Sequence, residues 1–126
     1  MILANAPVGA CLTVTDLDRA KQFYTEKLGL KVVPSEDPGG VLLEAGQGTM
    51  IFIYNSGAPK ATNTVAAFKV EDVLAAVNEL KANGVAFESY DMDPIKTDEN
   101  NIAHFGNVQA AWFKDTEGNI LSVANM

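Results

Sequence analysis

The sequence repeats one pattern, with the second copy about 56 positions after the first. Residues 14–17 read Val-Thr-Asp-Leu, and residues 70–73 read Val-Glu-Asp-Val. An alternating apolar run precedes each passage, and a helical pattern follows it and stops at Gly29 or Gly84. Repetition at this period predicts two copies of one supersecondary unit, neither of which covers its own apolar face alone.

Composition limits the class of protein. A chain of 126 residues, 48% of them hydrophobic, suits a single compact domain, which we expect to span 1–126 as modules 1–60 and 61–126. No apolar stretch approaches the ~20 residues of a membrane span, and residues 1–10 lack the pattern of a secretory signal. The single cysteine, Cys11, excludes an internal disulfide and agrees with a reducing compartment. We therefore expect a cytoplasmic protein without a membrane partner.

The net charge of -7, from sixteen acidic and nine basic side chains, would repel a phosphate backbone. Nucleic acid is therefore not an expected partner. Two explanations of the acidity stay open: it keeps a small protein soluble, or it attracts a cationic ligand.

In the first module, the alternation of residues 10–15 predicts a strand, and Thr15 or Asp16 is placed to cap the helix that follows. Leu17, Ala20, Tyr24 and Leu28 fall on one stripe of that helix, with Phe23 beside it. Strands are predicted at 30–33, 41–45 and 49–54, separated by turns at Asp37-Pro38-Gly39-Gly40 and at 46–48.

The second module restarts after a polar linker at 55–63. Its pattern predicts a strand at 65–70, a helix at 71–83, and strands at 85–90, 110–114 and 119–124. The interval 91–108 is poor in apolar residues and predicts a long surface loop, either a lid or a flexible segment.

Two motifs resemble the vicinal oxygen chelate superfamily, which includes glyoxalases, bleomycin-resistance proteins and extradiol dioxygenases. The first runs from residue 14 to 29 and the second from 113 to 119, so that the resemblance covers nearly the whole chain. Their fixed residues are Val14, Asp16, Leu17, Ala20, Phe23, Tyr24, Leu28, Gly29, Phe113, Asp115, Gly118 and Asn119.

The resemblance implies an α+β fold in which two tandem βαβββ modules form an open, cup-shaped mixed sheet with helices outside. If Leu12, Val14 and Phe68 face the helices, the period of two in a strand sends their neighbours into the cup. Aromatic walls at Phe52, Tyr54 and Trp112 suit a small-molecule pocket, and the latter two can each donate a hydrogen bond. The predicted ligand-binding residues are Cys11, Thr13, Met50, Phe52, Tyr54, Val65, Ala67, His104, Trp112 and Ser122.

Metal-dependent members of the family carry His, Gln or Glu at four cup positions, which correspond here to Gly9, Phe52, Val65 and Ser122. Glycine, phenylalanine and valine side chains offer no lone pairs to a cation. We therefore expect no metal site and no cofactor.

Other residues with chemical potential have ordinary alternatives. His104 is a candidate general acid or base, or a structurally bonded histidine. Cys11 is a candidate nucleophile without a visible base, or an inert wall residue. Trp112 is a ligand platform or a core residue, because alternation does not settle its face. Asp115 and Asn119 are assigned a structural role around the turn at Gly118.

The sequence thus predicts a metal-free small-molecule binding protein that resembles bleomycin-resistance proteins, which confer antibiotic resistance by sequestering drugs. We expect a homodimer that holds a planar aromatic ligand, and the acidic surface favours a cationic one. No catalytic residue is assigned. The alternatives are a metal-dependent glyoxalase-type lyase or dioxygenase, and a non-catalytic interaction domain whose cup is filled by its own side chains.

Overall fold

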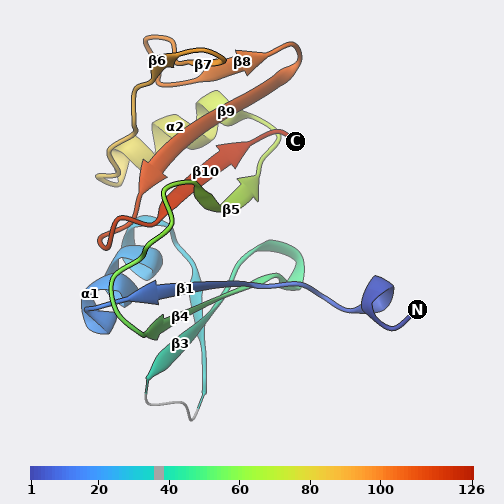
Figure 1. The fold of residues 1–126 in the computed structure, drawn as a ribbon, viewed down its shortest axis with the longest axis vertical. Coiled ribbons are helices and arrows are strands. Elements are labelled where there is room, and N and C mark those ends of the chain that lie inside the picture. The colour runs from blue at the N-terminus through green and yellow to red at the C-terminus, as the bar shows by residue number, and fades with distance from the viewer. Residues whose placement is uncertain (36–38) are drawn as a thin grey trace. The chain divides into compact units, whose positions relative to one another are not determined.

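The computed structural model describes residues 1–35 and 39–126. The chain divides into two compact units, Met1–Lys60 and Ala61–Met126, and each contains one four-stranded mixed sheet and one α-helix (Figure 1). The predicted α+β class with two βαβββ units is confirmed. Of the turn predicted at 37–40, Asp37 and Pro38 lie outside the described residues.

In the first unit the strands are ordered β1-β4-β3-β2 across the sheet. Strand β1 runs parallel to β4, and the other neighbours are antiparallel. The elements in chain order are η1 (Leu3–Asn5), β1 (Ala10–Val14), α1 (Leu17–Gln22), the π-helical turn η2 (Phe23–Lys27), β2 (Lys31–Val33), β3 (Gly40–Glu44), η3 (Gly46–Gly48) and β4 (Met50–Asn55).

The first helical segment begins at a capping carboxylate and ends at a glycine with positive φ. The Asp16 carboxylate accepts a hydrogen bond of 3.0 Å from the backbone N–H of Arg19, so Asp16 rather than Thr15 is the N-cap residue. The π-helical turn η2 continues α1, and after it Gly29 adopts φ = 77°, the left-handed conformation that stops a helical segment at little cost for glycine. Between these ends, Ala20 and Tyr24 are fully buried, as the predicted stripe requires.

The second unit has the strand order β5-β10-β9-β8, with β5 parallel to β10 and the remaining pairs antiparallel. Asp72 caps α2 through the Ala75 N–H, as Asp16 caps α1. The elements are β5 (Thr64–Lys69), α2 (Val73–Ala82), β6 (Asp91–Met92), β7 (Ile95–Lys96), β8 (Ala103–Phe105), β9 (Val108–Lys114) and β10 (Ile120–Ala124).

Two expectations for this unit are wrong. Residues 85–90 do not form a strand. Phe87 makes only an isolated bridge to Phe113, although Val85 is buried. The outer place in the sheet belongs to β8, which lies inside the interval predicted to be a loop. That interval also contains the β6-β7 ladder and the buried Ile102, so it is a partly structured excursion.

Alternate residues of each sheet pack against the helix of the same unit. In the first unit the buried strand residues are Leu12, Val14, Leu43, Ile51 and Ile53. In the second, those on the side of α2 are Ala111, Phe113, Leu121 and Val123, beside Val73 and Val77; the buried strand residues of the opposite face are Ala103, Ala110, Ser122 and Ala124. Because side chains alternate along a strand, the intervening residues project from the opposite face, which we call the helix-free face of each sheet. Among the described residues, no helix has the length and apolar character needed to cross a membrane.

Candidate functional site

The helix-free face of the first sheet carries five of the ten side chains predicted to bind a ligand. Strand register places Cys11 opposite Phe52 and Thr13 opposite Tyr54. Cys11 is exposed and the other three are partly exposed. The members of this face on the three longer strands are Cys11, Thr13, Gly40, Leu42, Glu44, Met50, Phe52 and Tyr54.

The rings of Phe52 and Tyr54 form a stacked pair on this face, with centroids 5.8 Å apart and planes 11° from parallel. Gly40 makes room for the pair. A Cβ atom at Gly40 would come within 2.3 Å of Phe52 Cζ, so any side chain there would displace the ring. The result is an aromatic pair with one phenolic hydroxyl, a composition typical of small-molecule sites.

The helix-free face of the second sheet contains Trp112, whose orientation alternation left open. Trp112 pairs with Ser122, and Ser122 pairs with Ala67, so the three residues lie in one row on one face. Phe113, the next residue, is fully buried on the other face. The residues of this face on β5, β9 and β10 are Thr64, Ala67, Lys69, Val108, Ala110, Trp112, Lys114, Ile120, Ser122 and Ala124.

The indole of Trp112 is held in place by two neighbours. Its Nε1–H donates a hydrogen bond of 3.1 Å to Thr64 Oγ1 on β5, two strands away from β9. Neighbouring strands are ~4.8 Å apart, so the ring must extend across β10, where Ser122 is only 5% exposed. Tyr90 packs edge-on against the indole at 5.6 Å. The indole N–H is therefore already engaged, and the expectation that it donates to a ligand is not met in this structure.

Thr64 is the residue of this site that the sequence reasoning missed. The register of β5 against β10 shifts between Ile120 and Leu121, so that Thr64 pairs with Ile120 while Val65 is the extra residue of a β-bulge. Alternation in the sequence predicted Val65 and Ala67 on the same face of the sheet, because a short apolar run does not reveal where a bulge occurs. The sequence carries no signal that joins Thr64 to Trp112, since the two residues are 48 positions apart.

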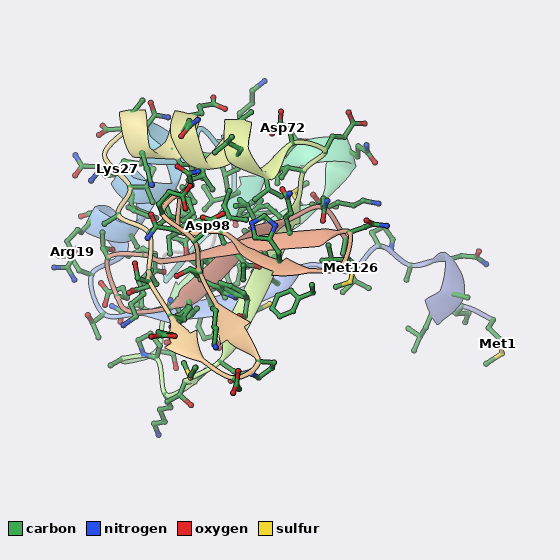
Figure 2. The ribbon with its side chains drawn as sticks, turned by 90° about the horizontal axis from the view of Figure 1, so that it is seen from above. Met1, Arg19, Lys27, Asp72, Asp98 and Met126 are labelled. Atoms are coloured by element: carbon green, nitrogen blue, oxygen red, sulfur yellow. The ribbon has the colours of Figure 1, made fainter. Side chains whose placement is uncertain are left out.

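His104 lies apart from the other predicted ligand-binding residues. It stands in β8 opposite Gln109, at the alternate position to Ala103 and Phe105, and so on the other face from Trp112. Its Nε2 is 2.8 Å from the Asp98 carboxylate, labelled in Figure 2, whose other oxygen accepts hydrogen bonds from the backbone of Asn100 and Ile102. His104 is therefore a structurally bonded histidine of the second unit.

The hydrogen bond from His104, assisted by the Asn100 and Ile102 backbone N–H groups, holds the pKa of Asp98 below its ordinary value of 3.8. A lowered folded pKa means that the ionised carboxylate stabilises the fold above pH 3.8 and that this contribution is lost as the pH falls through the lower value. We expect Asp98→Asn to reduce the urea midpoint at neutral pH and to weaken its decline on acidification.

The matched control is Asp93→Asn, since Asp93 is exposed and forms an exposed ion pair of 3.7 Å with Lys96. Urea titrations from about pH 7 to about pH 3 should show parallel curves for the wild type and Asp93→Asn, because exposed ion pairs contribute little. A decline as steep in Asp98→Asn as in the wild type would contradict the assignment.

Asp115 and Asn119 have the structural role that the sequence predicted. Asp115 Oδ1 accepts from the backbone N–H groups of Glu117 and Asn119, and Oδ2 accepts from Asn119 Nδ2 at 2.8 Å. Gly118 completes the turn with φ = 92°. Both polar residues are buried, and their polar atoms bind one another, so they shape the β9-β10 connection.

The four positions where relatives carry metal ligands do not fit a cation. Gly9 and Phe52 in the first unit, and Val65 in the second, offer no lone pair. Ser122 supplies one hydroxyl, and its neighbours in the row are Ala67 and Trp112. In the part of the chain that the structure describes, no group of three or more His, Cys, Asp or Glu residues is arranged to hold a metal ion.

Comparison with known proteins identifies relatives along almost the whole chain. The family model for the Glyoxalase/Bleomycin resistance protein/Dioxygenase superfamily matches residues 7–123. The chain is 30% identical over 115 residues to the uncharacterized protein YetH of Bacillus subtilis (strain 168). The alignment covers 85% of this chain and 87% of YetH.

Solved structures share the fold at lower identity. The crystal structure of UcmS2 is 21% identical with a TM-score of 0.72, covering 96% of this chain and 98% of that one. TnmS3, an antibiotic binding protein from Streptomyces sp. CB03234, is 21% identical with a TM-score of 0.67 and coverages of 94% and 93%. A lactoylglutathione lyase from Agrobacterium tumefaciens is 22% identical with a TM-score of 0.65 and coverages of 95% and 92%.

Proposed function

The chain belongs to the Glyoxalase/Bleomycin resistance protein/Dioxygenase superfamily, and from this membership we propose that it is a metal-free small-molecule binding protein. It holds a planar organic ligand by apolar and aromatic contact on the helix-free faces of its sheets. Sequestration of this kind is the mode of action of drug-binding resistance proteins, and it needs affinity but no catalytic group.

The observation that carries the proposal is the content of those faces. Each face presents an aromatic pair, Phe52 with Tyr54 on the first sheet and Trp112 with Tyr90 on the second. The positions that hold metal ligands in catalytic relatives are occupied by residues without imidazole or carboxylate groups. Similarity of fold to the antibiotic binding protein from Streptomyces agrees with such a role.

The proposal includes a cytoplasmic location and a homodimer. A single cysteine agrees with a reducing compartment, and the closed two-fold dimer is the commonest assembly among soluble proteins. Sedimentation equilibrium of the purified protein tests the second part, and a monomer at micromolar concentration would contradict it.

Each unit contains one natural reporter of ligand binding. Cys11, the only cysteine, is exposed beside Phe52 on the first face, and Trp112, the only tryptophan, lies on the second. We expect a bound planar ligand to slow the reaction of Cys11 with a thiol reagent and to change the fluorescence of Trp112. A panel of aromatic natural products and antibiotics should be titrated with both readouts, which also reveal the sheet that each compound contacts.

Two results would support other functions. Stoichiometric metal in the purified protein, together with lyase or dioxygenase activity restored by nickel, zinc, manganese or iron, would establish an enzyme. Absence of any response from both reporters across the panel would favour a non-catalytic interaction domain.

A further inference from the structure

The first nine residues form an apolar arm that leaves the first unit. Every residue of 1–9 is exposed, and the exposed fractions are 102% for Met1, 87% for Ile2, 84% for Leu3 and 84% for Val8. The chain continues the line of β1 away from the sheet in Figure 1, and Met1 lies beyond the strands of its unit in Figure 2. The arm carries no charged side chain. A cluster of exposed apolar residues of this kind marks an interaction surface.

Local structure directs the arm away from its own sheet. The turn η1 is closed by a hydrogen bond of 3.2 Å from the Ala6 N–H to the Leu3 carbonyl oxygen. Ala6 then has an extended backbone, with φ = -93° and ψ = 130°, because the ring of Pro7 disfavours a helical residue before it. Gly9 lies close to β4, where a Cβ atom would be 3.0 Å from the Met50 carbonyl oxygen. The arm would have to reverse its direction between these two constraints to cover its own sheet, so its apolar side chains need a contact elsewhere.

The helix-free face of the first sheet is an apolar surface that could provide this contact. Register aligns Val33, Leu42, Phe52 and Cys11 in one row across all four strands. Cys11 is exposed and the other three are partly exposed. The row is roughly 14 Å wide, because neighbouring strands are ~4.8 Å apart, and none of its side chains is charged. The row and the arm are therefore alike in chemistry, and each lacks a covering group in the single chain.

The charge distribution favours a second copy of this chain as the partner of the arm. Residues 1–60 contain six acidic and five basic side chains, so they carry -1 of the net charge of -7. The first units of two copies therefore approach each other with little repulsion. Each copy has both the arm and the row, so an exchange of arms makes two identical contacts and closes a two-fold dimer. At ~3.3 Å per residue, the arm reaches up to about 30 Å, which is enough to cross to a neighbouring subunit.

We propose that the arm of each copy docks on the helix-free face of the first sheet of the partner subunit, with Ile2 and Leu3 against the row that contains Phe52. The inference rests on the homodimer of the proposed function and names its interface. It also gives the ligand site of the first sheet an apolar wall beside the aromatic pair of Phe52 and Tyr54. The site of one chain is therefore incomplete without the arm of the other.

The double variant Ile2→Ser/Leu3→Ser tests the arm without disturbing the fold, because both side chains are exposed in the single chain. Sedimentation velocity over a range of concentrations should show a dimer for the wild type. The dissociation constant of the variant should be at least about 100-fold higher, since four buried apolar side chains per dimer are lost. Leu74→Ser is the matched control, because Leu74 is a 41% exposed leucine on α2 of the second unit, and its dimer should remain intact.

Cys11 reports where the arm docks, because it lies in the row and is exposed in the single chain. Without ligand, its reaction with a thiol reagent should be severalfold slower in the wild-type dimer than in the double variant. An unchanged Cys11 rate in a variant that no longer dimerises would overturn this docking face. A variant that dimerises as tightly as the wild type overturns the inference and leaves the proposed function standing. A monomeric wild type overturns the inference and the homodimer together, while the ligand titrations decide the binding function separately.

Discussion

Replacing Phe113 with alanine is expected to lower the free energy of unfolding by about 4 kcal/mol, among the largest effects of a single core truncation. The ring is fully buried, packs edge-on against Phe87 at 5.4 Å, and lies opposite Leu121 in the β9-β10 pair. Truncation removes these contacts and leaves a cavity beneath α2, because neighbours relax only partly. Urea unfolding followed by circular dichroism measures the loss.

Trp112→Ala is the matched comparison, since it removes the adjacent aromatic side chain of the same strand from the opposite face. The indole is partly exposed, so its loss should destabilise the fold less than the loss of Phe113. It should weaken aromatic ligands more than any other substitution on the second sheet. Equal destabilisation by the two variants would mean that Trp112 is a core residue, and the platform assigned to it would be wrong.

The features predicted correctly are those that short-range chemistry determines. Asp16, one of the two predicted cap candidates, caps α1 because its carboxylate reaches the N–H three residues later; Asp72, which the helix predicted at 71–83 included, takes the same role at α2. Gly29 and Gly84 end the helical patterns at positive φ. The alternation of the first sheet sorted Phe52 from its neighbours because that sheet has one covered face and one uncovered face.

The prediction of a strand at 85–90 was wrong because of the tertiary structure. Its residues alternate as a strand does, but the outer edge of β9 is divided between two segments. Phe87 bridges to Phe113 near one end of β9, and Ala103 to Phe105 pair with the other end. The three residues of β8 carry no strand pattern of their own, so they pair because the preceding ladder brings them there, a choice that local propensity does not encode.

Register decided the two remaining questions about the site. The pairing of Trp112 with Ser122 fixed the face of the indole, which the flanking alanines could not. The bulge at Val65 brought Thr64 into contact with it. Both depend on which strand lies beside which, information that becomes available only when the sheet is assembled. Register thus places eight of the ten predicted ligand-binding residues on a helix-free face, whereas Val65 lies in the bulge and His104 on the opposite face of β8.

Asp115→Ala is expected to destabilise the protein by about 3 kcal/mol, because it leaves three donors in the β9-β10 turn without an acceptor. The carboxylate is 7% exposed and accepts from two backbone N–H groups and from the Asn119 amide at 2.8 Å. Asp115→Asn should have a smaller effect if its oxygen keeps the backbone contacts, since only the bond to the Asn119 amide is then lost.

Glu99→Ala is the control, because it removes an exposed carboxylate of the same unit outside this turn. Its unfolding midpoint should stay near that of the wild type. The midpoint of Asp115→Asn should be lower, and that of Asp115→Ala lower still. The turn also sets the pairing of Trp112 with Ser122. In Asp115→Ala, the change in Trp112 fluorescence during a ligand titration should therefore extend over a broader range of ligand concentration. An Asp115→Ala variant as stable as Glu99→Ala would show that the hydrogen bonds of the carboxylate do not hold this part of the sheet.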